Sequence, residues 1–208
     1  MALPQVIFIE EFKGGFCMSK KLIIFDFFGV MSCEVAPTWL RRHFDEETAI
    51  RVKQKIVSRG DSGDLSEDGI YKELGALANV SPDTIQKDWM EIVKINDSLV
   101  DFIKSIKNDY KVALLSNATS TFLTRILNKY NYLYELFDLI VISSDIKMVK
   151  PDAEIFNFLL NKVGVRAEDS LMIDDNIVNI EGAKAAGIDG ILYRGMEEFV
   201  KEFQDKTC

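Results

Sequence analysis

Five short apolar runs constrain the fold of this chain more than any other feature of its sequence. They lie at residues 22–25, 112–115, 139–142, 171–173 and 190–193. Strands of a parallel sheet are buried on both faces, so they are apolar throughout rather than at alternate positions. Between the later runs, apolar residues recur at helical spacing within residues 122–130, 155–163 and 177–186. This alternation of strands and helices predicts an α/β fold, a doubly wound parallel sheet.

The stretch of residues 34–94 departs from this alternation. It has no convincing strand, and its apolar residues follow helical spacing within residues 39–44, 50–57, 70–77 and 85–93. We interpret it as a small helical domain inserted after the first strand. Residues 18–33 and 95–208 then form the core domain. Within the insert, we expect Arg59-Gly60-Asp61 to be a turn.

The first 17 residues allow two interpretations. Met18 is a second plausible start that stands directly before the first strand, and Lys13-Gly14-Gly15 could be encoded by the form of a bacterial ribosome-binding site. We expect residues 1–17 to be a translated leader. A native N-terminal arm is the alternative, because residues 6–9 are strand-like.

Composition and charge narrow the class of partner. A net charge of -8 without a cluster of Lys and Arg argues against nucleic acid. No run approaches the ~20 apolar residues that span a bilayer. The three cysteines form no C-x-x-C pair, which indicates a reducing compartment and no zinc site. We therefore expect a cytoplasmic protein that binds neither nucleic acid nor membrane, and the sequence carries no signal for an oligomeric state.

Four of the five runs are followed by polar or charged side chains: an acid, a hydroxyl, an amine and a pair of acids. In chain order they are Asp26, Ser116, Asn117, Lys150, Asp174, Asp175 and Asn179. In a doubly wound sheet, ligands bind outside the carboxyl ends of the strands, where the loops converge. We expect these side chains to meet at one edge of the sheet.

Together these side chains suit phosphoryl transfer. A carboxylate can be a covalent nucleophile. Magnesium prefers oxygen ligands, and three nearby carboxylates repel one another unless a cation lies between them. Ser116 and a neighbouring backbone N–H can hold a phosphate oxygen, while Lys150 offsets negative charge.

In this order, the four strand-end elements resemble the four motifs of the haloacid dehalogenase superfamily, over residues 20–193. The insert matches the position of that superfamily's first type of cap domain, placed on a Rossmann-like core. The resemblance implies a phosphatase that uses Mg²⁺ and hydrolyses a small phosphorylated metabolite through an aspartyl-phosphate. Residues 174–183 further resemble the branch typified by alpha-D-glucose-1-phosphate phosphatases, which suggests a sugar phosphate.

The resemblance also implies a role for each residue. Asp26 would be the nucleophile, Ser116 the phosphate-binding hydroxyl with Asn117 beside it, and Lys150 the amine that balances charge. The metal would be held by Asp26, the backbone carbonyl of Phe28 and Asp175. Asp174 and Asn179 would act on the metal through bound waters.

Phe28 departs from the family pattern, because phosphatases of this superfamily usually have a second Asp at this position as general acid and base. Three hypotheses follow. The chain is a phosphatase that works without this acid and favours leaving groups that need little protonation. Alternatively, it is a metal-independent 2-haloacid dehalogenase, since Asp26-Phe27-Phe28-Gly29 fits that motif. Lastly, it binds a phosphorylated ligand without turnover.

Substrate recognition is expected to come from the insert. Arg41, Arg42, Asp61 and Asp64 are candidates, although Arg41 and Arg42 also suit a solvated helix face. For His43, the only histidine, we expect a packing or solvent-facing role.

Overall fold

A computed structural model describes residues 20–207, so both interpretations of residues 1–17 lie outside the described residues. The described chain forms a sheet of five parallel strands in the order β3-β2-β1-β4-β5. The strands are β1 (Leu22–Phe25), β2 (Lys111–Ser116), β3 (Leu139–Ile142), β4 (Ser170–Asp174) and β5 (Asp189–Leu192). Each predicted run contributes a strand, and the predicted doubly wound α/β fold is confirmed.

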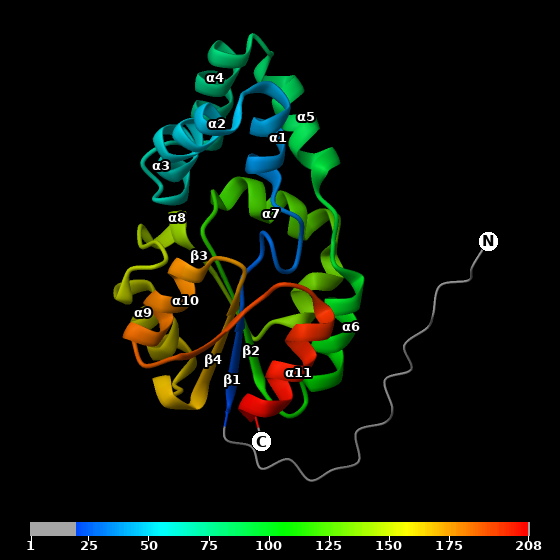
Figure 1. Ribbon diagram of the computed structural model, residues 1–208, viewed down its shortest axis with the longest axis vertical. Coiled ribbons are helices and arrows are strands. Elements are labelled where there is room, and N and C mark those ends of the chain that lie inside the picture. The colour runs from blue at the N-terminus through cyan, green and yellow to red at the C-terminus, as the bar shows by residue number, and fades with distance from the viewer. Residues whose placement is uncertain (1–19, 208) are drawn as a thin grey trace, which may run out of the picture.

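Helices cover both faces of the sheet because successive strand residues point to opposite sides. Ile23 and Phe25 pack toward α6 (Asp97–Ile106), α7 (Ser120–Lys129) and α11 (Met196–Thr207). Leu22 and Ile24 pack toward α9 (Ala153–Val163) and α10 (Ile177–Ala185). Figure 1 shows α9 and α10 on one side of the sheet and α6 and α11 on the other.

The remaining helical segments lie within residues 34–94 and in the connections of the core. Residues 34–94 form a group of helices beyond the carboxyl ends of the strands (Figure 1). They are α1 (Val35–His43), α2 (Glu46–Val52), the π-helical segment Lys53–Val57, α3 (Ser58–Asp61), α4 (Glu67–Ala78) and α5 (Pro82–Ile92). The core adds α8 (Ser143–Ile146) and two 3-10 segments, Asn131–Leu136 and Ala167–Asp169.

Side-chain caps show why several of these helices begin where they do. The side chains of Asp45, Ser66, Ser81 and Asn96 each accept a hydrogen bond from the backbone N–H three residues later. Such a bond satisfies one of the N–H groups that have no partner within the helix. These caps are local, so they are encoded by the sequence around each helix start.

Two connecting segments join the insert to the core and lie side by side. Ser32 forms an antiparallel bridge with Ile95, and the N–H of Asn96 donates to the carbonyl of Met31 at 2.9 Å. The chain therefore leaves and re-enters the core at one place. Within residues 20–207, no helix combines the length and apolar character that a membrane span requires.

The structure corrects the prediction for Arg59-Gly60-Asp61. These residues are helical, as the end of α3, and the turn follows at Ser62 and Gly63. Gly60 packs tightly here, because an added Cβ would lie 2.3 Å from Ile70 and 2.8 Å from Thr119. The glycine marks a close approach between helices rather than a turn.

Candidate active site

The loop after β1 places Asp26 beside β4, at the point where the strand order reverses direction. The backbone N–H of Asp26 donates to the carbonyl of Ile173 at 2.9 Å, and its Oδ1 accepts from the N–H of Phe27 at 2.6 Å. Asp26 is buried. Its carboxylate is thereby fixed between the ends of the two central strands.

Lys150 joins two carboxylates of this cluster. Its Nζ lies 2.9 Å from Oδ1 of Asp26 and 2.6 Å from Oδ2 of Asp174. Asn117 holds the Lys150 backbone, because its Oδ1 accepts from the Lys150 N–H at 2.9 Å and its Nδ2 donates to the carbonyl at 2.8 Å. The amine is thus oriented from β2 and bound to the ends of β1 and β4.

Asp174 is satisfied by the protein itself. Besides Lys150, its carboxylate accepts from Nδ2 of Asn179 at 3.0 and 3.1 Å and from the N–H of Asn176 at 2.9 Å. Its side chain is fully buried. Asp174 therefore organises Lys150 and the start of α10.

Asp175 differs, because it is half-buried and lines the cavity, and the ion pairs of Lys150 are with Asp26 and Asp174 instead. Its carboxylate lies against Gly29, where an added Cβ would be 2.1 Å from Oδ2 of Asp175. Gly29 also has a φ of +89°, which favours glycine. The loop after β1 thus leaves room for the Asp175 carboxylate next to Asp26.

The pKa values of Asp26, Asp175 and Lys150 in this cluster are raised. Burial raises the pKa of Asp26 well above its usual value, and the charges of Asp174 and Asp175 add to this despite Lys150. Burial, Glu34 and Asp174 raise the pKa of Asp175 to about 6. Burial opposes the charged form of Lys150, but Asp26 and Asp174 outweigh it and raise the pKa of the amine.

These residues fit a divalent cation. Oxygen atoms of Asp26, Asp174 and Asp175 lie within 4.8 Å of one another. One ammonium group, that of Lys150, offsets charge in this group of three carboxylates. A hard cation would remove the remaining repulsion, and carboxylate oxygens are the ligands it prefers.

Ser116 ends β2 and is fully buried. Its Oγ has no hydrogen-bond partner among the described residues. A buried hydroxyl without a partner is costly unless a ligand completes it. Asn117, Ala118 and Thr119, which follow it, line the cavity.

Phe28 also lines the cavity, two residues after Asp26. Its ring stacks on Phe122 with a centroid distance of 5.8 Å and meets Phe27 edge-on at 5.0 Å. These contacts give the ring a packing role on the floor of the cavity.

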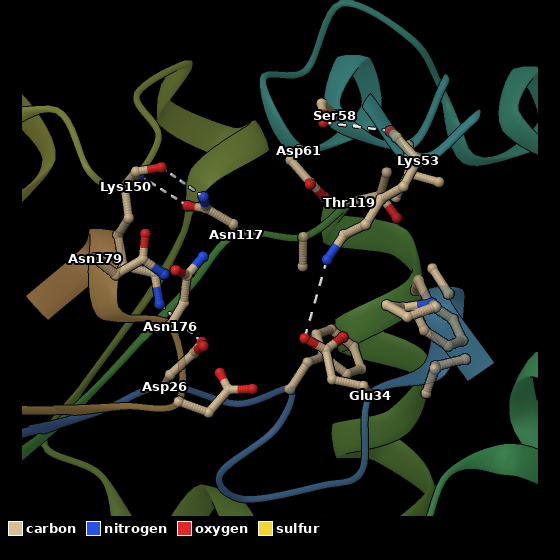
Figure 2. A pocket seen from close by; sticks show the side chains of 18 of the residues that line it. Asp26, Glu34, Lys53, Ser58, Asp61, Asn117, Thr119, Lys150, Asn176 and Asn179 are labelled. Carbon is tan, nitrogen blue, oxygen red and sulfur yellow. Dashed lines mark hydrogen bonds and ion pairs between the residues drawn. The ribbon is translucent and has the colours of Figure 1, made fainter. Parts of the chain in front are cut away.

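The cavity has a volume of about 310 Å³ and lies between the core and the insert. Figure 2 shows Asp26, Asn117 and Lys150 on the core side, with Lys53, Ser58 and Asp61 on the side of the insert. Glu34 and Lys53 form an ion pair that lines the cavity, with Nζ and Oε1 4.0 Å apart (Figure 2). Sequence reasoning missed both, because each lies in a segment whose sequence reads as an ordinary charged helix surface.

The other candidates from the insert lie elsewhere. Arg41 and Arg42 are exposed, and Arg41 pairs with Glu46 at 2.9 Å. Asp64 is exposed and accepts from Ser62 at 2.7 Å. His43 stacks on Trp39 with a centroid distance of 4.0 Å, in agreement with a packing role. Of the insert residues proposed from sequence, only Asp61 lines this cavity.

A doubly wound sheet with carboxylates and a lysine at its switch point defines an α/β enzyme that acts at the carboxyl ends of its strands. The model of the haloacid dehalogenase-like hydrolases matches residues 20–187. The chain belongs to this family of hydrolases.

Two phosphatases are among the similar curated proteins. The phosphoglycolate phosphatase 1 of Pseudomonas aeruginosa is 27% identical over 134 residues, which are 64% of this chain and 49% of that protein. A sesquiterpene phosphatase of Aspergillus oryzae is 22% identical over 184 residues, which are 84% of this chain and 90% of that protein. The chain spans 29% to 54% of the length of the first three curated relatives.

A solved structure shows the same fold. It is a haloacid dehalogenase family enzyme from Bacteroides thetaiotaomicron in complex with magnesium and inorganic phosphate. The TM-score is 0.73 at 21% identity, and the match covers 88% of this chain and 99% of that chain. At this identity the likeness establishes the fold.

Proposed function

We propose that this chain is a magnesium-dependent phosphatase that hydrolyses a small phosphorylated metabolite through an aspartyl-phosphate on Asp26. The observation that carries the proposal is the buried cluster in which Asp26 shares Lys150 with Asp174 and lies next to Asp175. The phosphatases among the similar proteins support this class of reaction.

In this proposal, an oxygen of Asp26 attacks phosphorus and the ester oxygen leaves. Lys150 favours the ionised form of Asp26 against the effect of burial and holds its carboxylate in place, because Lys150 is itself held by Asn117 and Asp174. The free hydroxyl of Ser116 and the N–H groups that follow β2 bind the phosphate oxygens. Water then cleaves the acyl phosphate and restores the Asp26 carboxylate.

Asp26, Asp175 and the backbone carbonyl of Phe28 would hold Mg²⁺ directly, and Asp174 with Asn179 would support it through water. When bound, the cation screens the negative charge between the nucleophile and the phosphate. The fully satisfied carboxylate of Asp174 suits an indirect role.

We further propose that residues 34–94 act as a cap on a core made of residues 18–33 and 95–208. The paired connecting segments near Ser32 and Ile95 support this division. The cavity of about 310 Å³ suits a ligand of the size of a sugar phosphate.

A dehalogenase is the alternative that Phe28 favours, because a halide leaves without a proton. Such an enzyme needs no cation, whereas the three carboxylates here carry more charge than Lys150 offsets. Dependence on magnesium therefore separates the two functions.

The test is a screen of phosphorylated metabolites with magnesium and with a chelator. We expect turnover only with magnesium, and Asp26→Asn should lower it at least about a thousandfold, because the nucleophile is lost. The variant should melt near the parent, since Asn preserves the shape of the side chain. Activity of the variant within about tenfold of the parent would refute the assignment.

A further inference from the structure

The proposed function leaves one chemical need unmet on the core side of the cavity. When the bond from phosphorus to an alkyl ester oxygen breaks, that oxygen needs a proton. Phe28, two residues after Asp26, has no proton to give, and its ring is committed to Phe27 and Phe122. The inference below rests on the proposed phosphatase function.

The other titratable groups discussed above that line the cavity interact with partners or belong to the group that fits a cation. Lys150 is bound by Asp26 and Asp174. Lys53 and Glu34 face each other as an ion pair. Asp175 belongs to the group of carboxylates that fits a cation.

Asp61 is the exception. Its carboxyl group forms no hydrogen bond or ion pair with another side chain of the described residues, although it is half-buried. Figure 2 shows Asp61 on the side of the cavity that the insert forms, across from Asp26. A leaving group attached to a phosphate on Asp26 would extend toward this side.

The core itself positions Asp61. Its backbone carbonyl accepts from Oγ of Ser143 at 2.5 Å, and the same Oγ accepts from the N–H of Ala118 at 3.0 Å. The preceding residue, Gly60, lies so close to Thr119 that an added Cβ would be 2.8 Å from its side chain. Asp61 is therefore anchored to the loop after β2, which also binds Lys150 through Asn117.

The surroundings of Asp61 favour its protonated form. Burial, together with the charge of Glu34 at the start of α1, raises the pKa of Asp61 to about 7. Lys53 of the π-helical segment and Lys150 after α8 act in the opposite direction. A carboxyl group with this pKa is protonated in a large fraction of molecules near neutral pH, as a proton donor must be.

We propose that Asp61 supplies the proton to the leaving oxygen and takes the place of an acid at position 28. As Asp26 bonds to phosphorus, the electron pair of the ester bond passes to the leaving oxygen, which accepts the Asp61 proton. An alcohol leaves, and Asp61 becomes a carboxylate. When water attacks the aspartyl-phosphate, Asp61 takes a proton from that water, and phosphate and the Asp26 carboxylate are restored.

The test compares an alkyl with an aryl ester, glycerol 1-phosphate and 4-nitrophenyl phosphate. Nitrophenolate leaves without a proton, so only the alkyl ester depends on the donor. In Asp61→Asn, we expect kcat/KM for glycerol 1-phosphate to fall about a hundredfold or more and that for 4-nitrophenyl phosphate to fall less than about tenfold. Asp68→Asn is the matched control, because Asp68 is exposed and lies in the insert away from the cavity.

A pH profile provides a second measurement. In the parent, the ratio of alkyl to aryl kcat/KM should fall as pH rises through about 7, because Asp61 loses its proton. This ratio cancels the titration of groups that both esters share. In Asp61→Asn the ratio should be independent of pH.

The possible results distinguish failure of the proposed role of Asp61 from failure of the proposed phosphatase function. A parent that cleaves neither ester with magnesium refutes the phosphatase function. An active parent whose alkyl-to-aryl ratio is the same in Asp61→Asn refutes only the role of Asp61. If the variant does not fold, a series of esters on the parent decides, because a steep dependence of kcat/KM on leaving-group pKa excludes any proton donor.

Discussion

The hydroxyl of Ser116 is buried without a hydrogen-bond partner among the described residues. Its effect on stability should therefore depend on whether phosphate is bound. Without ligand, Ser116→Ala should leave the melting temperature unchanged or raise it, because removing an unsatisfied buried hydroxyl recovers up to about 1–3 kcal/mol. With inorganic phosphate and magnesium, the ligand-induced rise in melting temperature should be smaller than in the parent. A clear loss of stability together with an unchanged phosphate effect would show that Ser116 has a packing role alone.

At the scale of elements, the loop after β1 allows a test of the metal site, because its Gly29 lies against Asp175. Gly29→Ala introduces a Cβ 2.1 Å from the position of the Asp175 carboxylate, at a φ of +89°. We expect a loss of about 1–2 kcal/mol for the backbone conformation, together with loss of the magnesium-induced rise in melting temperature.

Gly164→Ala is the control for Gly29. Gly164 ends α9 at a φ of +71°, and nothing lies within 4 Å of an added Cβ. It should cost a similar amount of stability and leave the magnesium effect intact. Equal magnesium responses in the two variants would contradict the proposed place of Asp175 in the metal site.

An ion pair between a half-exposed arginine and a buried carboxylate joins α4 and α7. Arg125 of α7 donates two hydrogen bonds to Glu67 of α4, at 2.6 and 3.0 Å, and Tyr71 donates a third at 2.5 Å. Burial disfavours the charged form of Glu67, but these donors outweigh it and lower the pKa of the carboxyl. Arg125→Met should cost roughly 1–3 kcal/mol, because it removes two hydrogen bonds from a buried carboxylate.

Urea unfolding measures this cost. The double variant Glu67→Gln, Arg125→Met should recover part of the loss, since no charge stays buried. Arg59→Met is the control, because the pair of Arg59 and Glu73 is exposed and should contribute less than about 1 kcal/mol. A loss in Arg125→Met no larger than in this control would mean that the α4–α7 contact depends on apolar packing alone.

For the whole molecule, the raised carboxyl pKa values predict how stability depends on pH. Asp61 and Asp175 bind protons more tightly in the folded chain, with pKa values of about 7 and about 6, than in the unfolded chain, where Asp titrates near 3.8. Their contribution to the free energy of unfolding is fully present below the unfolded pKa, and it is lost as pH rises through the folded pKa. The metal-free melting temperature should therefore fall between about pH 5 and about pH 8.

Magnesium should reduce this slope, because the cation competes with protons for the carboxylates of Asp26 and Asp175. Thermal melts in a chelator and in saturating magnesium measure both slopes. Asp61→Asn should flatten the metal-free slope, since one of the carboxyl groups with a raised pKa is removed. A metal-free melting temperature that rises steadily over this range would be inconsistent with the raised pKa values.

Much of the fold and of the core side of the site was predictable, because the signals are local. Each apolar run is long enough to indicate a buried strand, and the site residues after β1, β2 and β4 lie at or just beyond the ends of these strands. Parallel strands present their carboxyl ends at one edge, so Asp26 and Asp174 had to meet there once the sheet formed. Lys150 follows α8, and its hydrogen bonds with Asn117 bring it to the same edge.

The tertiary structure decided what the other side of the cavity contains. Helical periodicity in residues 34–94 indicates which positions are apolar, but it does not show which helix faces the core. The packing of the insert turns Arg41 and Arg42 to solvent and brings Glu34, Lys53 and Asp61 into the cavity. The sequence by itself therefore determined the sheet and the charged edge at its strand ends. Which residues of the insert face that edge depended on long-range contacts, such as those of Asp61 with Ser143 and of Gly60 with Thr119. Contacts between distant segments have no periodic signal in the chain, so the sequence did not show them.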